Sequence, residues 1–237
     1  MNCLLLSAGK GERLLPKTEV LPKCLLPMTE YGTMLNYWIT LLSDISIDTI
    51  FINVFWKKEL IIEYVRKLRP RLRNKVSFYS EEYLEPVGMV LANLNHRNLG
   101  KEFLIVNSDT YIERPLVKIF VEKTSTTSEV PICLGTSLQA DVFGKSRIII
   151  NKNGVVAKFE EKPMEGSGLS YAGILKMHHS VLNEFSLTEL KKKELTQDIL
   201  PVFVGRMSIS NVGFIMDIGG SIDAYNYAKR VLGGGST

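Results

Sequence analysis

Apolar and polar positions in the first half of the chain follow two alternating patterns. Short runs rich in Ile, Val, Leu or Phe predict β-strands at residues 2–7, 49–55, 76–80 and 102–107. Longer segments, in which apolar residues recur every three or four positions, predict helices near residues 33–44, 58–69 and 88–97. Strands and helices in alternation predict a mostly parallel sheet with helices covering both of its faces.

The pattern changes in the second half of the chain, where strand-like runs follow one another with few helices between them. These runs are residues 130–136, 147–151, 155–160 and 171–177. Residues 151–154 are typical of a hairpin turn, and a last helix is predicted at 221–232. The sequence therefore predicts an α/β fold class: a Rossmann-like mixed, mostly parallel sheet flanked by helices, with antiparallel strands added in the second half. We expect one domain over residues 1–232 and a flexible tail at 233–237.

Composition narrows the class of protein. Of the 237 residues, 45% are hydrophobic and 23% are charged, which is typical of a globular protein. The net charge of +4 fits an enzyme with anionic substrates, and the basic stretch at 66–75 is more typical of a solvated helix end than of a nucleic-acid contact. The longest apolar runs have the length of a strand, which predicts no membrane partner. Three cysteines without CxxC spacing favour a cytoplasmic protein without disulfides.

The loop after the first strand combines backbone freedom with positive charge. Gly9 and Gly11, in the same turn as Ala8, allow backbone N–H groups to approach an anion closely. Arg13 and Lys23 add two positive charges to a segment that prolines stiffen. This combination predicts a site for a polyphosphate such as a nucleoside triphosphate. A tight turn without a ligand is the alternative, but it does not explain the two cations.

Two other nucleotide-binding loops fit this segment less well. A dinucleotide-binding fingerprint would have its third glycine at position 14, where the chain has Leu14. A Walker P-loop requires a GK[ST] sequence, which the chain lacks. An NAD-dependent oxidoreductase is therefore disfavoured.

Two apolar strands end in a carboxylate. Residues 103–108 run into Asp109, and residues 214–216 run into Asp217. Ligands of open α/β sheets bind at the carboxyl ends of the strands, so Asp109 is placed to hold Mg²⁺ against phosphate oxygens. From the residues alone, Asp109 could equally cap a turn, and Asp217 is more typical of a helix N-cap.

Residues 9–14, Pro16, Thr18 and residues 22–27 resemble the signature of nucleotidyltransferases that act on sugar 1-phosphates. The resemblance implies that Ala8, Gly9 and Gly11 lie in the loop that holds the triphosphate. It further implies that Arg13 and Lys23 hold the phosphates at the reacting centre, and that Asp109 and Asp217 bind the nucleotide's Mg²⁺.

The resemblance also implies residues that bind the acceptor. Glu161-Lys162-Pro163 is similar to the family's sugar-phosphate motif, so Glu161 is expected to accept hydrogen bonds from sugar hydroxyls and Lys162 to hold the acceptor phosphate. Gly144 precedes this motif, and Gly173 follows it in a segment similar to the family's Asn-Ala-Gly. Gly88 matches a glycine near the base and the sugar phosphate.

Two positions depart from the family's pattern. Met89 stands where a threonine is expected, and Tyr171 replaces the asparagine of Asn-Ala-Gly. Both changes fall on the acceptor and base side of the predicted site, so they concern the identity of the substrate rather than the type of chemistry.

The resemblance implies transfer of a nucleoside monophosphate from a nucleoside triphosphate to a sugar 1-phosphate, with release of pyrophosphate. The chain is similar to the short mannose- and heptose-1-phosphate guanylyltransferases and to short uridylyl- and cytidylyltransferases. The predicted catalytic residues are Arg13, Lys23 and Lys162, and the predicted cofactor is Mg²⁺. The predicted partners are the triphosphate and a phosphorylated acceptor, with a possible homodimer. A cytidylyltransferase for a non-sugar phosphate and a catalytically silent regulatory subunit are the alternatives.

Overall fold

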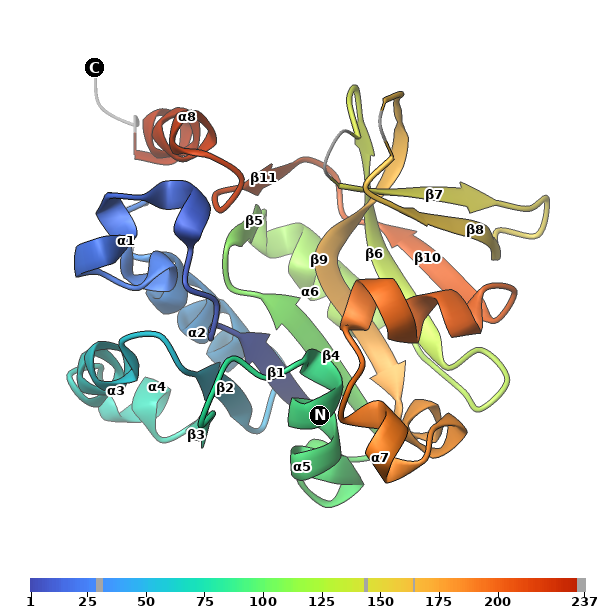
Figure 1. Ribbon diagram of the computed structural model, residues 1–237, viewed down its shortest axis with the longest axis horizontal. Coiled ribbons are helices and arrows are strands. Elements are labelled where there is room, and N and C mark those ends of the chain that lie inside the picture. Colours follow the sequence, from blue (N-terminus) through green and yellow to red (C-terminus); the bar gives the residue numbers. More distant parts are fainter. Residues whose placement is uncertain (29–31, 143–144, 164, 234–237) are drawn as a thin grey trace. The chain divides into compact units, whose positions relative to one another are not determined.

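The computed structural model describes residues 1–28, 32–142, 145–163 and 165–233, which fold into two compact units (Figure 1). The N-terminal unit comprises Asn2–Leu84, Val106–Tyr111 and Met216–Thr237. The central unit comprises Met1, Glu85–Ile105 and Ile112–Ile215. A single domain over residues 1–232 stays a prediction. The last helix extends to Gly233, and the remaining residues of the predicted tail lie outside the described part of the chain.

Three parallel strands form the core of the N-terminal unit. They are β1 (Asn2–Leu6), β2 (Ile50–Val54) and β3 (Val76–Ser80), hydrogen-bonded in the order β1-β2-β3. Leu6 of β1 lies opposite Asn53 of β2, so the strands end together at one edge. The side chains of β1 and β2 are mostly buried, as expected for parallel strands that are covered on both faces.

Helices surround these three strands. They are α1 (Lys17–Val20), α2 (Met34–Asp44), α3 (Lys58–Arg66), α4 (Pro70–Arg73) and α8 (Ile222–Gly233), with the 3-10 turns η1 (Glu12–Leu14) and η2 (Lys23–Leu25). Helix α2 begins where the Thr33 side chain accepts a hydrogen bond from the Asn36 backbone N–H. It buries Leu35, Trp38 and Ile39 almost completely, and burial of this apolar face fixes the helix against the core.

The central unit contains the antiparallel strands that the second half of the sequence predicts. Its strands β4 (Glu102–Asn107), β6 (Ile132–Gln139), β9 (Gly168–His178) and β10 (Met207–Asn211) are ordered β10-β6-β9-β4, and the last two residues of β4 belong to the N-terminal unit. Strand β6 is antiparallel to β9 and parallel to β10. Strands β7 (Ser146–Ile150) and β8 (Val156–Glu161) form the predicted hairpin, which projects beyond β6 and β9 in Figure 1.

Several further elements complete the chain. They are α5 (Val87–Leu99), α6 (Arg114–Lys123), α7 (Leu187–Leu190), the 3-10 turns η3 (His179–Glu184) and η5 (Leu200–Phe203), the π-helical turn η4 (Leu195–Ile199), and the paired strands β5 (Thr110–Ile112) and β11 (Ile215–Asp217). The sequence pattern predicts neither α6 nor β10. The apolar stripe of α6 is short, with Val117, Phe120 and Val121 buried.

The basic stretch at 66–75 contains the end of α3 and all of α4. Most of its side chains are exposed, and the Arg71 guanidinium lies 3.1 Å from the Asp44 carboxylate. This agrees with a solvated helix end.

None of the helices in the described residues is long and apolar enough to cross a membrane.

Candidate functional site

The loop that follows β1 is closed by contacts with α1. Gly11 has a φ of 69°, a left-handed conformation in which glycine is favoured. A Cβ atom at this position would lie 2.9 Å from Thr18 Cγ2, so a side chain would not fit without movement. The buried Thr18 hydroxyl donates a hydrogen bond to the Gly11 carbonyl oxygen at 2.9 Å. The turn that the sequence predicts to bind phosphate is therefore held in one conformation by its own chain.

Lys23 is directed toward Asp109. It begins the turn η2, and its Nζ atom forms an ion pair with Asp109 Oδ2. The two side chains are only 18% and 17% exposed, although the residues are 86 positions apart. The structure thus brings together a predicted phosphate-binding cation and a predicted metal ligand.

Three backbone contacts fix the position of Asp109 after β4. The Ser108 N–H donates to the Leu6 carbonyl oxygen at 3.1 Å, which joins this turn to the end of β1. The buried Trp38 indole N–H donates to the Thr110 carbonyl oxygen at 3.1 Å. The Ile218 N–H donates to the Asp109 carbonyl oxygen at 2.9 Å, which places the segment of Asp217 beside it.

Asp217 ends β11, and its side chain folds back onto its own turn. Its Oδ1 atom accepts a hydrogen bond from the Gly219 N–H at 2.8 Å. This is an aspartate turn and not a helix N-cap, because α8 begins only at Ile222, where the Ser221 hydroxyl accepts a hydrogen bond from the Ala224 N–H.

The charges of this cluster act on one another. Burial by itself would raise the pKa of Asp109, but the charge and hydrogen bond of Lys23 outweigh burial and hold that pKa below its ordinary value. Burial, and then the negative charge of Asp109, raise the pKa of Asp217. Burial opposes the charge on Lys23, but Asp109 and Asp217 together raise the pKa of its ammonium group. Arg13 is exposed on η1, and its charge is a smaller influence on the pKa of both aspartates. The cluster therefore holds two carboxylates that repel each other and one lysine that pairs with Asp109 and whose charge also acts on Asp217.

Gly219 lets the backbone approach the ion pair closely. A Cβ atom at this position would lie 2.7 Å from Lys23 Nζ and closer still to Asp109 Oδ2. No side chain fits there without displacing the pair. In the sequence, Gly219 ends an Asp-Ile-Gly stretch, and nothing in the pattern around it indicates this contact.

We expect Gly219→Ala to lower the nucleotidyl transfer that the sequence resemblance implies by roughly 10- to 100-fold, because a displacement of about 1 Å at reacting groups has effects of this size. The measurement is pyrophosphate release under initial-rate conditions. Gly220→Ala is the matched comparison. A Cβ atom at position 220 would lie 3.3 Å from the nearest atom, Asp217 Oδ2, so this variant should lower the rate less. Equal rates for the two variants would show that this backbone does not confine the ion pair.

The predicted acceptor residues belong to the central unit. Glu161 ends β8, and its carboxylate accepts a hydrogen bond from the Thr196 hydroxyl at 3.3 Å. Lys162 has a φ of 48° and an exposed side chain, and its N–H donates to the Lys145 carbonyl oxygen at 2.7 Å. Gly173 is a buried residue of β9 with a φ of 74°, beside the register shift between Leu134 and Thr136. Their roles in acceptor binding stay predictions.

Two other glycines, Gly144 and Gly88, are predicted to bind substrate or nucleotide. Gly144 lies outside the described residues. Gly88 packs against the chain near α7: its N–H donates to the Lys193 carbonyl oxygen at 2.9 Å, and a Cβ atom would collide with the Leu190 carbonyl oxygen. This packing is a structural reason for a glycine at position 88, and its contact with a nucleotide stays a prediction.

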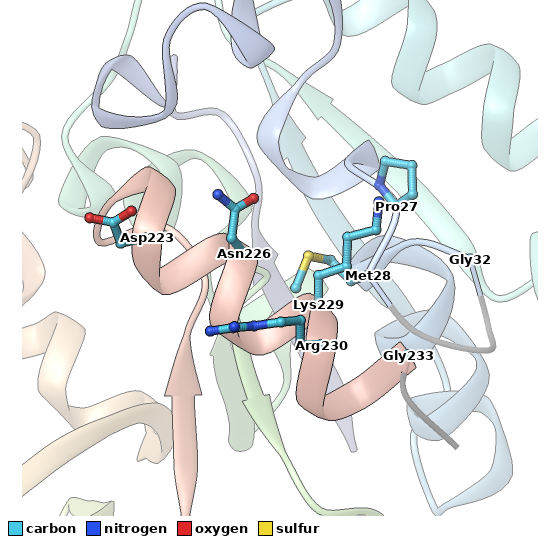
Figure 2. A pocket seen from close by; sticks show the side chains of 8 residues that line it. All are labelled: Pro27, Met28, Gly32, Asp223, Asn226, Lys229, Arg230 and Gly233. Atoms are coloured by element: carbon cyan, nitrogen blue, oxygen red, sulfur yellow. The ribbon is translucent and has the colours of Figure 1, made fainter. Parts of the chain in front are cut away.

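A cavity of about 980 Å³ lies within the N-terminal unit, away from the predicted site residues (Figure 2). Figure 2 shows its lining divided between α8 and the segment around Pro27: Pro27, Met28, Gly32, Asp223, Asn226, Lys229, Arg230 and Gly233. The Tyr225 hydroxyl donates to the Pro27 carbonyl oxygen at 2.9 Å and joins the two walls. None of the residues predicted to bind phosphate or metal lines this cavity.

Parallel strands, a glycine-containing loop after β1 and a lysine–carboxylate pair at the strand ends define a Rossmann-like α/β protein. The chain belongs to the nucleotidyl transferase family, whose profile matches residues 2–229. Mannose-1-phosphate guanylyltransferase 1 of Arabidopsis thaliana is 27% identical over 227 residues, which cover 92% of this chain and 61% of that protein. The chain thus spans about three-fifths of the length of this relative.

Solved structures show the same fold. HddC from Yersinia pseudotuberculosis superimposes with a TM-score of 0.78 at 21% identity, covering 97% of this chain and 98% of HddC. A putative glucose-1-phosphate thymidylyltransferase from Bacillus anthracis superimposes with a TM-score of 0.80 at 18% identity, covering 98% and 95% of the two chains. The predicted α/β fold class is therefore confirmed.

Proposed function

We propose that the chain transfers a nucleoside monophosphate from a nucleoside triphosphate to a sugar 1-phosphate and releases pyrophosphate. The observation that carries this proposal is the cluster of Lys23, Asp109 and Asp217, together with the closed glycine loop of the same unit. The family membership and the similarity to mannose-1-phosphate guanylyltransferase 1 support the same reaction.

The reaction needs placement and charge more than proton transfer. The acceptor phosphate is already anionic near neutral pH, so its oxygen can attack the α-phosphorus in line with the departing pyrophosphate without a general base. Lys23 lies by the reacting phosphates, where its ammonium group offsets developing negative charge. Arg13, which is exposed on η1, stabilises the leaving pyrophosphate. The N–H groups of the Ala8–Gly9–Gly11 loop hold the triphosphate.

Asp109 and Asp217 suit a magnesium ion. Mg²⁺ prefers oxygen ligands, and it is usually held by one or two carboxylates together with substrate phosphates. Burial, and then the negative charge of Asp109, raise the pKa of Asp217, and a divalent cation would relieve the repulsion between the two carboxylates. When bound, Mg²⁺ would neutralise charge on the phosphate oxygens. Phosphate oxygens and water would complete the coordination of an ion held by these two carboxylates.

On the acceptor side, Lys162 holds the phosphate and Glu161 the sugar hydroxyls. By the family resemblance, Gly144 and Gly173 belong to the same acceptor site, and Gly88 to the nucleotide site. The pair of Glu161-Lys162-Pro163 and Tyr171-Ala172-Gly173 favours a sugar over a non-sugar acceptor such as phosphocholine. Retention of Arg13, Lys23 and both aspartates favours an enzyme over a silent regulatory subunit. A homodimer and a cytoplasmic location are further proposals that rest on the family resemblance and on the cysteine pattern.

The test is a matrix of the four common nucleoside triphosphates with Mg²⁺ against sugar 1-phosphates and non-sugar phosphorylated metabolites, with pyrophosphate release as the readout. Turnover with a sugar 1-phosphate supports the proposal. Turnover only with a non-sugar phosphate supports the cytidylyltransferase type of reaction. No turnover with any pair favours the regulatory subunit.

Asp217→Asn should raise the thermal stability of the protein and lower its activity. Because the pKa of Asp217 is raised in the folded protein, this carboxyl favours folding only while it is protonated, and that contribution is lost as pH rises through the raised pKa. At pH 7 the ionised group therefore opposes folding, and the neutral amide should raise the Tm measured without metal. A change of 1 kcal/mol corresponds to roughly 2–4 °C in a domain of this size. Turnover with Mg²⁺ should nevertheless fall, by about 10²- to 10³-fold. A lower Tm for this variant at pH 7 would contradict the argument.

A further inference from the structure

The backbone N–H of Ser7 and the side chains of Asn53 and Glu81 form a buried chain of hydrogen bonds across the ends of β1, β2 and β3. Ser7 follows β1, Asn53 lies in β2, and Glu81 follows β3. They are only 8%, 4% and 1% exposed. Because the three strands are parallel and adjacent, their carboxyl ends share the edge at which α/β proteins bind ligands.

Asn53 connects the other two residues. Its Oδ1 atom accepts a hydrogen bond from the Ser7 N–H at 2.8 Å, and its Nδ2 group donates to Glu81 Oε1 at 2.7 Å. The Glu81 N–H in turn donates to the Val54 carbonyl oxygen at 3.0 Å. The donor and acceptor directions leave one orientation for the Asn53 amide, so the backbone of Ser7 is fixed at the start of the glycine loop.

The hydroxyl of Ser7 has no such partner. It is buried, and among the described residues it has no hydrogen-bond partner. A buried hydroxyl without a partner has lost its hydrogen bonds to water without replacing them, so it is an unfavourable group in the free protein. It stands next to Ala8 and two residues before Gly9, in the loop to which we assign the triphosphate.

We propose that the Ser7 hydroxyl hydrogen-bonds directly to the bound nucleoside triphosphate, and that Asn53 and Glu81 are the positioning residues that hold Ser7 for this contact. The inference rests on the proposed function. Glu81 and Asn53 act through the backbone of Ser7, and the nucleotide supplies the partner that the hydroxyl lacks.

Ser7→Ala tests the direct contact. Binding of GTP with Mg²⁺, and of the other three nucleoside triphosphates, is measured by titration calorimetry without an acceptor. The variant should bind the preferred nucleotide about 10-fold more weakly, the effect of one lost hydrogen bond. Its Tm without nucleotide should be unchanged or higher, because no hydrogen bond of the free protein is lost.

Ser43→Ala is the matched control. The Ser43 hydroxyl of α2 is also buried without a hydrogen-bond partner among the described residues, but it lies at the other end of this helix from Thr33 and has no predicted role. Ser43→Ala should likewise have an unchanged or higher Tm, but it should bind nucleotide as tightly as the wild-type protein. If Ser7→Ala binds nucleotide as tightly as Ser43→Ala, the direct contact is refuted.

A charge-swapped pair tests the positioning role. Asn53→Asp places two buried carboxyl groups against each other and should weaken nucleotide binding. Adding Glu81→Gln restores a donor–acceptor pair, with the amide now on residue 81, and keeps an oxygen at residue 53 for the Ser7 N–H. The double variant should therefore bind nucleotide within about 3-fold of wild type, a difference below one hydrogen bond. A soluble, folded double variant that binds no better than Asn53→Asp would refute the positioning role.

Different outcomes would refute the proposed function and the role of Ser7. Wild-type protein that neither binds nor turns over any of the four triphosphates would refute the proposed function. Wild-type protein that binds a triphosphate, with Ser7→Ala binding it equally well, would refute the further inference alone.

Discussion

Asp109→Asn should lower turnover by about 10²- to 10³-fold or more while the protein remains folded. The amide cannot carry the negative charge that a magnesium ion requires, and the loss of one such electrostatic contact costs about 10²- to 10³-fold in rate. Lys23 also loses its ion-pair partner, so the Tm should fall, although the charge of Asp217 still acts on the lysine. Pyrophosphate release and thermal unfolding of the same preparation measure the two effects.

Asp223→Asn is the control for Asp109→Asn, because Asp223 is an exposed aspartate in the first turn of α8. We expect its turnover to stay at the wild-type level. An active Asp109→Asn enzyme would contradict the metal assignment. The comparison with Asp217→Asn is also informative, since the opposite pKa shifts of the two aspartates predict opposite changes in Tm at pH 7 without metal.

Lys23→Met should reduce turnover by about 10²- to 10³-fold, because methionine fills much of the same space without the charge that acts on the phosphates. Breaking a buried ion pair typically costs about 3–5 kcal/mol, and partial exposure of both side chains places this pair at or below the lower end of that range. Rates are therefore measured well below the Tm of the variant. Normal turnover by folded Lys23→Met would exclude Lys23 from the reacting centre.

The stability lost in Lys23→Met should depend on pH. The lowered pKa of Asp109 in the wild-type protein contributes stability above the ordinary pKa of an aspartate, and this contribution is lost as pH falls through the lowered value. The difference in unfolding free energy between wild type and variant should therefore shrink in acid. Lys118→Met is the control, since Lys118 is an exposed residue of α6 whose Nζ atom lies 3.9 Å from Glu122. A difference that grows in acid would contradict the assigned ion pair.

Local sequence patterns predict much of this fold. The strand at 76–80 is predicted with the bounds that β3 has, and the helix at 33–44 differs from α2 by one residue. These elements are strongly apolar or strongly periodic, so the local pattern decides them. Helix α6 is different, because its stripe of three buried side chains is too short to stand out between polar residues. Strand β5 is only three residues long and is not predicted, whereas β11 lies within one residue of the apolar strand expected at 214–216.

Some residues of the candidate site can likewise be predicted from the sequence, and others cannot. The cations and carboxylates are visible in the sequence because Arg13 and Lys23 flank a glycine loop and each aspartate ends an apolar strand. Asn53 and Glu81 give no comparable signal. Polar residues are usually exposed, so nothing in the sequence indicates that these two are buried and bonded to each other.

By itself, the sequence determined the strands, the glycine loop and the residue types that suit phosphate and magnesium, because these depend on neighbours along the chain. The tertiary structure decided which of those residues meet. Lys23 pairs with Asp109 across 86 positions, Gly219 allows their close contact, and Asn53 joins Ser7 to Glu81. Such contacts depend on how strands and turns align in space, and burial then makes each charge act strongly on the next.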